Sequence, residues 1–151
     1  MKTLVLIRHS YALSRYEAGV PRDELRPLSA QGREKAALTA QRLAQLPVRP
    51  VRLLTSPLRR AVETAQILSQ GWKIPILQAE ELNGLQSEEK VAEFLQEQVS
   101  QFSPLLAVGH NPNFSCLYSL LCGQPFVFAP GAFAVLQTDE KGNWRPVYLG
   151  E

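Results

Sequence analysis

Short apolar runs alternate with segments of helical periodicity along this chain, and this alternation limits the possible folds more than any other feature. Residues 2–8, 51–55, 74–77 and 105–108 are apolar runs too short for helices, and we interpret them as buried strands. Strands that alternate with helices favour a mostly parallel sheet with helices on both faces. The predicted fold class is therefore α/β, a three-layer α/β/α sandwich with a mostly parallel sheet.

Four segments carry helix signals, namely a Ser or Pro before the segment, apolar residues at helical spacing, and a Pro or Gly near its end. The predicted helices run from Ser29 to Leu46, from Ser56 to Gly71, from Ser87 to Phe102 and from Asn111 to Cys122. Residues 132–138 and 144–149 are predicted to form a terminal hairpin. Residues 11–28 show no clear period, so we expect a long loop, which in a compact domain often has a function.

Length and charge exclude several classes of protein. The chain of 151 residues has the size of one domain, and its scattered Pro and Gly suggest no linker, so we expect a single domain over residues 1–151. A net charge of +2 with 20% charged residues does not suggest a nucleic-acid binder. No apolar stretch approaches the roughly 20 residues of a membrane helix, so no membrane partner is expected.

The cysteines and the N-terminus bear on the cellular compartment. Cys116 and Cys122 lie six positions apart in one predicted helix, where they face different ways and cannot form a disulfide with each other. Both are predicted to be core residues. The apolar run at residues 4–7 is too short for the core of a signal peptide. Together these features predict a reduced, cytoplasmic protein.

Three polar motifs follow three of the predicted strands. They are Arg8-His9, Ser56-Pro57-Leu58-Arg59-Arg60-Ala61 and Gly109-His110-Asn111-Pro112, and they contain both histidines of the chain. The carboxyl ends of parallel strands lie at one edge of a sheet, so these side chains are expected to converge there. Guanidinium groups and helix N-termini both favour phosphate. The sequence therefore predicts a cationic site for a phosphoryl group.

In this order and at this spacing, the motifs resemble those of the histidine phosphatase superfamily, which has the phosphoglycerate mutase-like fold. The matching residues are Leu6-Ile7-Arg8-His9, Ser56-Pro57-x-x-Arg60-Ala61-x-x-Thr64-Ala65 and Gly109-His110-Asn111-Pro112. Arg26-Pro27-Leu28-Ser29-x-x-Gly32, the late Pro130-Gly131-Ala132 and the short chain resemble the SixA-like branch of phosphohistidine phosphatases. The resemblance covers nearly the whole chain.

The resemblance implies that His9 is a nucleophile and that Arg8, Arg60 and His110 complete the phosphate pocket. Arg60 matches the family motif because the family arginine directly precedes the small residue, although the helical position alone would also suit Arg59. The two arginines beside His9 should disfavour its protonation and keep it nucleophilic. The implied reaction passes through a phosphohistidine and uses no cofactor or metal, since the arginines supply the positive charge.

An acidic residue after the third strand donates the leaving-group proton in phosphoester-cleaving relatives. Glu81 is the nearest candidate here, but the longer acidic signature of the mutase branch is missing. A phosphoramidate demands less, because its imidazole leaves readily once protonated. We therefore expect a SixA-like enzyme, an open monomer, whose substrate and partner is a phosphorylated protein such as a phosphohistidine carrier or phosphorelay domain.

Other interpretations stay open at this point. The chain could be a phosphatase of small phosphomonoesters, or a non-catalytic phosphate-binding module. Among single residues, Arg60 could lie on a solvated helix face, His110 could merely satisfy a helix cap, and Glu81 could be an ordinary exposed acid. Ser10, which stands where many relatives have Gly, could add a hydroxyl contact or simply be a surface residue.

Overall fold

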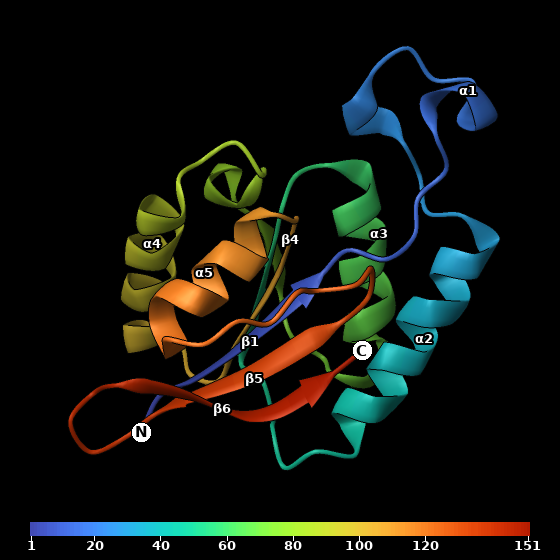
Figure 1. Cartoon of the computed structure of the whole chain (residues 1–151). Helices are drawn as coiled ribbons and strands as arrows, with labels where there is room; N and C mark the ends of the chain where they lie inside the picture. Colours follow the sequence, from blue (N-terminus) through green and yellow to red (C-terminus); the bar gives the residue numbers. More distant parts are fainter.

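A six-stranded sheet lies at the centre of the protein, in a computed structural model that describes all residues 1–151 (Figure 1). Its strands are β1 (Thr3–Arg8), β2 (Arg52–Thr55), β3 (Ile76–Gln78), β4 (Leu105–Gly109), β5 (Phe133–Thr138) and β6 (Trp144–Gly150). The order is β3-β2-β4-β1-β5-β6, with β3, β2, β4 and β1 parallel, β5 antiparallel to β1, and β6 antiparallel to β5. The predicted mostly parallel sheet is confirmed, and only β3 begins two residues later than expected.

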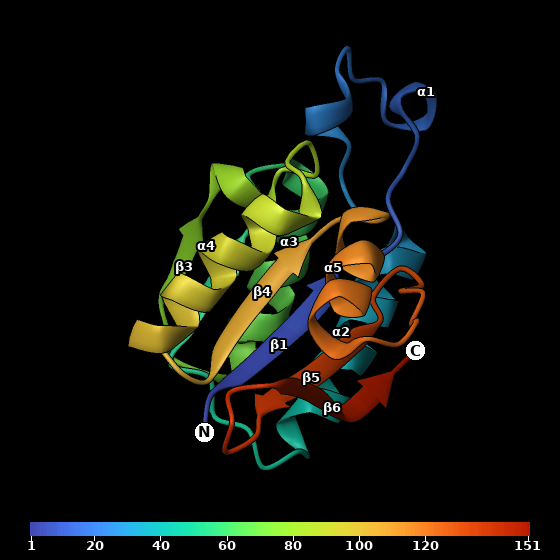
Figure 2. The same ribbon diagram turned by 60° about the vertical axis from the view of Figure 1, so that its left-hand side comes forward.

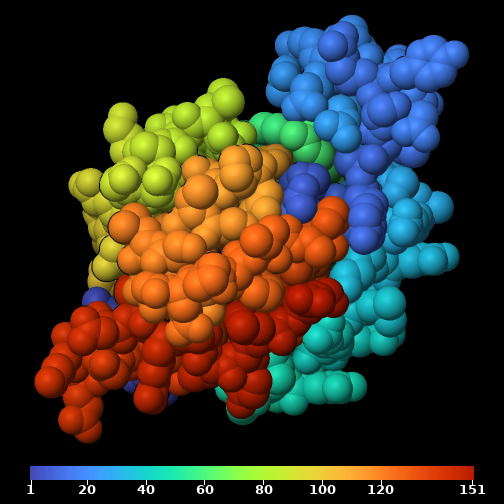
Figure 3. All heavy atoms as spheres, in the orientation of Figure 1, coloured from blue at the N-terminus to red at the C-terminus, as the bar shows by residue number.

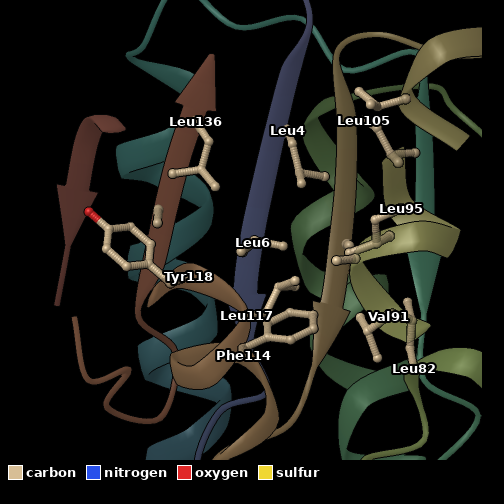
Figure 4. Close-up of a cluster of buried hydrophobic side chains, with 14 of the residues drawn as sticks. Leu4, Leu6, Leu82, Val91, Leu95, Leu105, Phe114, Leu117, Tyr118 and Leu136 are labelled. Carbon is tan, nitrogen blue, oxygen red and sulfur yellow. The ribbon is translucent and has the colours of Figure 1, made fainter. Parts of the chain in front are cut away.

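Two pairs of helices cover the two faces of this sheet (Figure 2). They are α2 (Ala30–Ala44) and α3 (Arg59–Leu68) on one face, and α4 (Glu88–Gln101) and α5 (Asn113–Cys122) on the other. Leu4 and Leu6 of β1 join the larger core under α4 and α5 (Figure 4), whereas Val5 and Ile7 join the smaller core under α2 and α3. Successive strand residues point to opposite faces, so a strand covered on both faces is apolar throughout. The predicted three-layer sandwich is confirmed.

The helix starts follow the predicted caps at two of four positions. The hydroxyl of Ser29 accepts a hydrogen bond from the Gly32 N–H, and that of Ser87 accepts one from the Lys90 N–H. Ser56 is not a cap, because α3 begins only at Arg59. At the other end a short 3₁₀ turn, η2 (Ser69–Gly71), follows α3. At the fourth helix, α5 begins at Asn113 rather than at the predicted 111–112 pair.

Residues 11–28 form a segment that projects beyond the carboxyl edge of the sheet (Figure 1). Most of the segment is irregular, as the predicted long loop implies, but it also contains the short helix α1 (Arg15–Ala18) and the 3₁₀ turn η1 (Asp23–Leu25), which were not predicted. These turns are too short for periodicity to show them, although Ser14 and Glu17 form a capping box at α1. The ends of the segment are joined by a bridge between Ala12 and Leu28.

The prediction that both cysteines belong to the core is wrong for Cys116, which is exposed, while Cys122 is partly buried. The buried face of α5 consists of larger residues, among them Phe114, Leu117 and Tyr118. The helical period therefore turns Cys116 toward solvent.

None of the helices combines the length and the hydrophobicity that crossing a membrane requires.

Candidate active site

The ends of β1, β2 and β4 meet at one edge of the sheet, where they form a cavity of about 660 Å³. Its lining consists of Arg8, His9, Asp23, Glu24, Arg26, Pro57, Leu58, Arg60, Glu80, Asn83, Gly84, Leu85, His110 and Asn111. In Figure 3 the 11–28 segment (blue) rises on one side of this opening and the segment around residues 80–86 (yellow-green) lies on the other. The structure thus brings together all four residues predicted for the pocket: Arg8, His9, Arg60 and His110.

His9 is held in one orientation by its own backbone neighbour. Its Nδ1 lies 2.7 Å from the Ser10 carbonyl oxygen, and because a carbonyl only accepts, Nδ1 carries the proton and donates it. The pKa of His9 is lowered to about 4, mainly by burial and to a smaller extent by the charges of Arg60, Arg8 and Arg26, against the opposing effect of the Ser10 hydrogen bond. The imidazole is therefore neutral near pH 7, with the lone pair on Nε2. The arginines contribute as predicted, but burial is the larger cause.

His110 is nearly fully buried. The centroids of its ring and the His9 ring are 5.0 Å apart. Burial lowers the pKa of His110 to about 3, with smaller effects from His9 and Arg60. Its Nε2 lies 2.7 Å from the Ser56 hydroxyl, which can donate to the unprotonated nitrogen of a neutral ring. Ser56, predicted as a helix cap, instead orients a histidine of the site.

Gly84 covers the other side of His110. A Cβ at this position would lie 3.3 Å from the imidazole, and the φ of +89° is one that residues with side chains rarely adopt. The loop after β3 can therefore approach the histidine closely only with glycine at this place.

The structure separates Arg60 from Arg59. Arg60 is 8% exposed and lines the cavity, where its Nη1 donates to the Asp23 carbonyl at 3.0 Å. The side chain of Arg59 is 51% exposed and pairs with Glu63 at 3.0 Å, outside the cavity. The residue that matches the family motif is thus the one that reaches the pocket.

Thr64, Ala61 and Ala65 of the second motif hold α3 against the sheet and against the segment that follows β1. The Thr64 hydroxyl accepts a hydrogen bond from the Ser10 N–H at 3.1 Å and donates one to the Arg60 carbonyl at 2.8 Å. Ala61 and Ala65 are fully buried in the core between α3 and the sheet. Ser10 itself is fully buried and its hydroxyl has no partner, so both roles considered for that hydroxyl, a pocket contact and surface solubility, are wrong.

Arg8 is fixed from the opposite direction. Its Nη1 donates to the Phe128 carbonyl at 2.9 Å, and the Asn111 side-chain amide donates to the same oxygen at 3.2 Å. Burial lowers the pKa of Arg8 below its usual value. A guanidinium group nonetheless stays cationic at neutral pH. The Phe128 carbonyl thereby connects Arg8, the last residue of β1, to Asn111 of the Gly-His-Asn-Pro motif.

Arg26 and Asp23 are among the pocket residues that were not predicted. Arg26 lines the cavity, and its Nε donates to the Leu13 carbonyl at 2.8 Å. Its Nη1 pairs with one carboxylate oxygen of Asp23 at 3.0 Å. The only signal for Arg26 in the sequence was its place in a Pro-containing motif of a long loop, which gives no side-chain direction.

Glu81, the candidate acid, does not reach the cavity. Both glutamates are exposed, but Glu80 lines the cavity and Glu81 lies outside it. Both stand in the 3₁₀ turn η3 (Glu80–Leu82), which turns neighbouring side chains in different directions.

No group of three or more His, Cys, Asp or Glu side chains is placed to hold a metal ion.

The site therefore combines a neutral imidazole with a free Nε2 and three guanidinium groups, from Arg8, Arg26 and Arg60. Guanidinium groups bind the oxygens of a phosphoryl group, and a neutral imidazole can attack its phosphorus atom. This arrangement suits transfer of a phosphoryl group to a histidine.

Comparisons with known proteins agree with this geometry. The sequence profile of the histidine phosphatase superfamily (branch 1) matches residues 4–87. An uncharacterized protein of Picosynechococcus sp. is 35% identical over 114 residues, which are 73% of this chain and 67% of that protein. The structure of the protein histidine phosphatase SixA complexed with tungstate superposes with a TM-score of 0.87 at 26% identity, over 99% of this chain and 96% of that one. The alpha-ribazole phosphatase of Shigella flexneri gives a TM-score of 0.78 at 20% identity, over 99% and 96%. The predicted phosphoglycerate mutase-like fold is confirmed.

Proposed function

Because this chain belongs to the histidine phosphatase superfamily, we propose that it removes phosphoryl groups from phosphohistidine side chains of other proteins, through a covalent intermediate on His9. The observation that carries this proposal is the hydrogen bond from Nδ1 of His9 to the Ser10 carbonyl. It leaves Nε2 unprotonated in a pocket with three arginines. A nucleophile and the charges that stabilise its transition state are thus present together.

The reaction then follows in two steps. The guanidinium groups of Arg8, Arg26 and Arg60 bind the phosphoryl oxygens, and Nε2 of His9 attacks phosphorus while the bond to the substrate imidazole breaks. The substrate imidazole is protonated by solvent on its other ring nitrogen and therefore departs as a neutral group. A water molecule next attacks the phosphohistidine, its oxygen forms the new bond to phosphorus, the electron pair of the broken bond returns to His9, and one proton of the water is released to solvent. His110 is close enough to His9 to bind an oxygen of the same phosphoryl group.

Two observations support a protein substrate. The chain is 26% identical to the protein histidine phosphatase SixA over 99% of its length. The cavity also opens to solvent between the 11–28 segment and the segment around residues 80–86 (Figure 3), so a side chain on another protein can enter it. We further propose that the protein acts as a monomer in the cytoplasm, where its two free cysteines stay reduced.

A second candidate function is hydrolysis of small phosphomonoesters. Glu80 favours it, because a carboxyl group at the cavity can protonate an ester oxygen as it leaves. The similarity in fold to an alpha-ribazole phosphatase is compatible with it. The third candidate, a phosphate-binding module without catalysis, requires only the arginines.

The deciding experiment compares the cleavage of a phosphohistidine carrier protein with that of p-nitrophenyl phosphate, and traps radiolabelled phosphate on the enzyme during turnover. We expect kcat/KM to be higher on phosphohistidine by about two orders of magnitude or more, and His9→Ala to abolish both turnover and trapped phosphate. Arg59→Ala is the matched control and should keep both. Comparable rates on the two substrates would favour the monoesterase. Phosphate binding without trapped phosphate would favour the binding module.

A further inference from the structure

We propose that Asp23 is a positioning residue that holds Arg26 and Arg60 side by side for the phosphoryl group. The inference deepens the proposed function and rests on it, since it assumes that these two arginines bind phosphate. Asp23 lies in η1 of the 11–28 segment, which the sequence predicted as a plain loop.

Each oxygen of the Asp23 carboxylate engages a different arginine. Oδ1 lies 3.0 Å from Nη1 of Arg26, and Oδ2 lies 3.0 Å from Nη2 of Arg60. The backbone carbonyl of Asp23 also accepts a hydrogen bond from Nη1 of Arg60 at 3.0 Å. One residue thus joins the cation of the projecting segment to the cation of α3.

The two arginines need such a bridge because their charges repel each other. Both lie close enough to His9 to lower its pKa, so their fields overlap in the same pocket. Asp23 stays ionised there, because the hydrogen bonds and charges of Arg26 and Arg60 outweigh partial burial and hold the pKa of Asp23 below its usual value. An anion between two cations removes the repulsion and fixes both geometries.

Arg26 depends on this bridge more than Arg60 does. Arg60 keeps its bond to the Asp23 backbone carbonyl whatever the side chain, and it is buried in the wall of the cavity. The side chain of Arg26 is 27% exposed, and its remaining bond is the one from Nε to Leu13. Without the carboxylate, the outer end of Arg26 is free to turn into solvent.

Both guanidinium groups keep donors for a ligand while Asp23 holds them. A guanidinium has five N–H donors. Two donors of Arg60 are used by Asp23. Two donors of Arg26 are used, one by Asp23 and one by the Leu13 carbonyl. Each arginine therefore retains three of its five donors. The bridge therefore orients the arginines without saturating them, as a supporting residue of a binding site must.

The test is a double-mutant cycle with Asp23→Asn and Arg26→Gln, read out by calorimetric binding of inorganic phosphate and by phosphohistidine hydrolysis. We expect each single variant to weaken phosphate binding and to raise KM by about tenfold, with kcat within about threefold of wild type. The double variant should be little worse than either single one, since both remove the same ordered cation. Glu17→Gln removes a carboxylate of the same segment outside the cavity and is the matched control.

Three results would overturn the proposal. Tighter phosphate binding by Asp23→Asn would show that the Asp23 carboxylate competes with phosphate for the arginines. Additive losses of phosphate affinity in the double variant would show that Asp23 acts independently of Arg26. If the NMR signal of the Arg26 Nε–H had the same intensity in wild type and in Asp23→Asn, the Arg26 side chain would be equally ordered without the Asp23 carboxylate. A wild type that binds phosphate but leaves phosphohistidine intact would refute only the proposed function, whereas one that binds no phosphate would refute both.

Discussion

The two sides of the pocket are built in different ways. On the sheet side, His9 and His110 are largely buried and are held by the Ser10 carbonyl and the Ser56 hydroxyl. On the side of the 11–28 segment, Asp23 and Arg26 are partly exposed and are held mainly by an ion pair. The sheet side has the rigidity and low polarity that a neutral nucleophile requires, whereas the segment side supplies charge that water can partly screen.

This contrast indicates that the two sides of the pocket contribute to different steps of the reaction. Changes on the sheet side should act on the chemical step, and so on kcat, whereas changes on the segment side should act on binding, and so on KM. The Asp23 cycle described above tests the segment side. The following predictions test the contrast itself, in order of decreasing effect.

The largest effect is expected at Arg60, which contacts both sides of the pocket. Arg60→Ala should lower kcat/KM by a factor on the order of 10² to 10³, since it removes one of the charges that stabilise the transition state. Arg59→Ala, one position away and paired with Glu63, should stay within about twofold. Steady-state kinetics on a phosphohistidine protein measure both. A larger loss in Arg59→Ala would show that the wrong arginine has been placed in the pocket.

Acid should destabilise the sheet side before the segment side. Unfolded histidines take up protons near pH 6.5, but the folded pKa is about 4 for His9 and about 3 for His110. The unfolded state therefore binds more protons below pH 6.5, and the free energy of unfolding falls as the pH drops through this window, by on the order of 3 kcal/mol for His9 at pH 4. The folded pKa of Asp23 lies below 3.8, so the stability from its ion pairs is present above that value and is lost only at lower pH.

Urea unfolding between pH 4.5 and 7.5 measures this acid sensitivity. His9→Gln leaves only His110 to titrate in this window and should reduce the slope to about half, whereas Asp23→Asn should leave the slope unchanged. An equal slope in wild type and His9→Gln would contradict the neutral, buried state assigned to His9.

A smaller effect is expected at Ser56, because it acts only through His110. Ser56→Ala should lower kcat by about five- to tenfold and leave KM within about twofold, since a buried imidazole nitrogen loses its partner. Ser10→Ala is a matched control, because that hydroxyl is also buried at the site but has no partner. If Ser56→Ala changed KM and not kcat, the assignment of the sheet side to the chemical step would be wrong.

The smallest effect on phosphohistidine is expected at Glu80. Glu80→Gln should change phosphohistidine turnover by less than about threefold, since a protonated imidazole leaves without an acid. Any side activity on an alkyl monoester such as glycerol 2-phosphate, whose poor leaving group needs a proton, should fall further in Glu80→Gln than in Glu81→Gln, because only Glu80 lines the cavity. The ratio of the two activities in each variant measures this, and an equal loss on both substrates would favour an ester-cleaving enzyme.

The same contrast explains how far the sequence could predict the site. Arg8, His9 and His110 directly follow or end parallel strands, and apolar runs mark those strands in the sequence. Arg26 and Asp23 stand in irregular chain, where no period shows which way a side chain points. Arg8 and the two histidines of the sheet side were therefore predicted, whereas Asp23 and Arg26 of the segment side were not.

By itself the sequence determined the layered α/β fold and the sheet edge at which both histidines meet, because hydrophobic periodicity and strand direction are properties of the local chain. The family motif favoured Arg60 over Arg59, although local periodicity could not separate them. Only the tertiary structure decided between Glu80 and Glu81, and only it placed Asp23 between two arginines. Neighbouring residues of a helix point about 100° apart. Which of them faces the pocket therefore depends on how the whole helix or turn packs against the sheet.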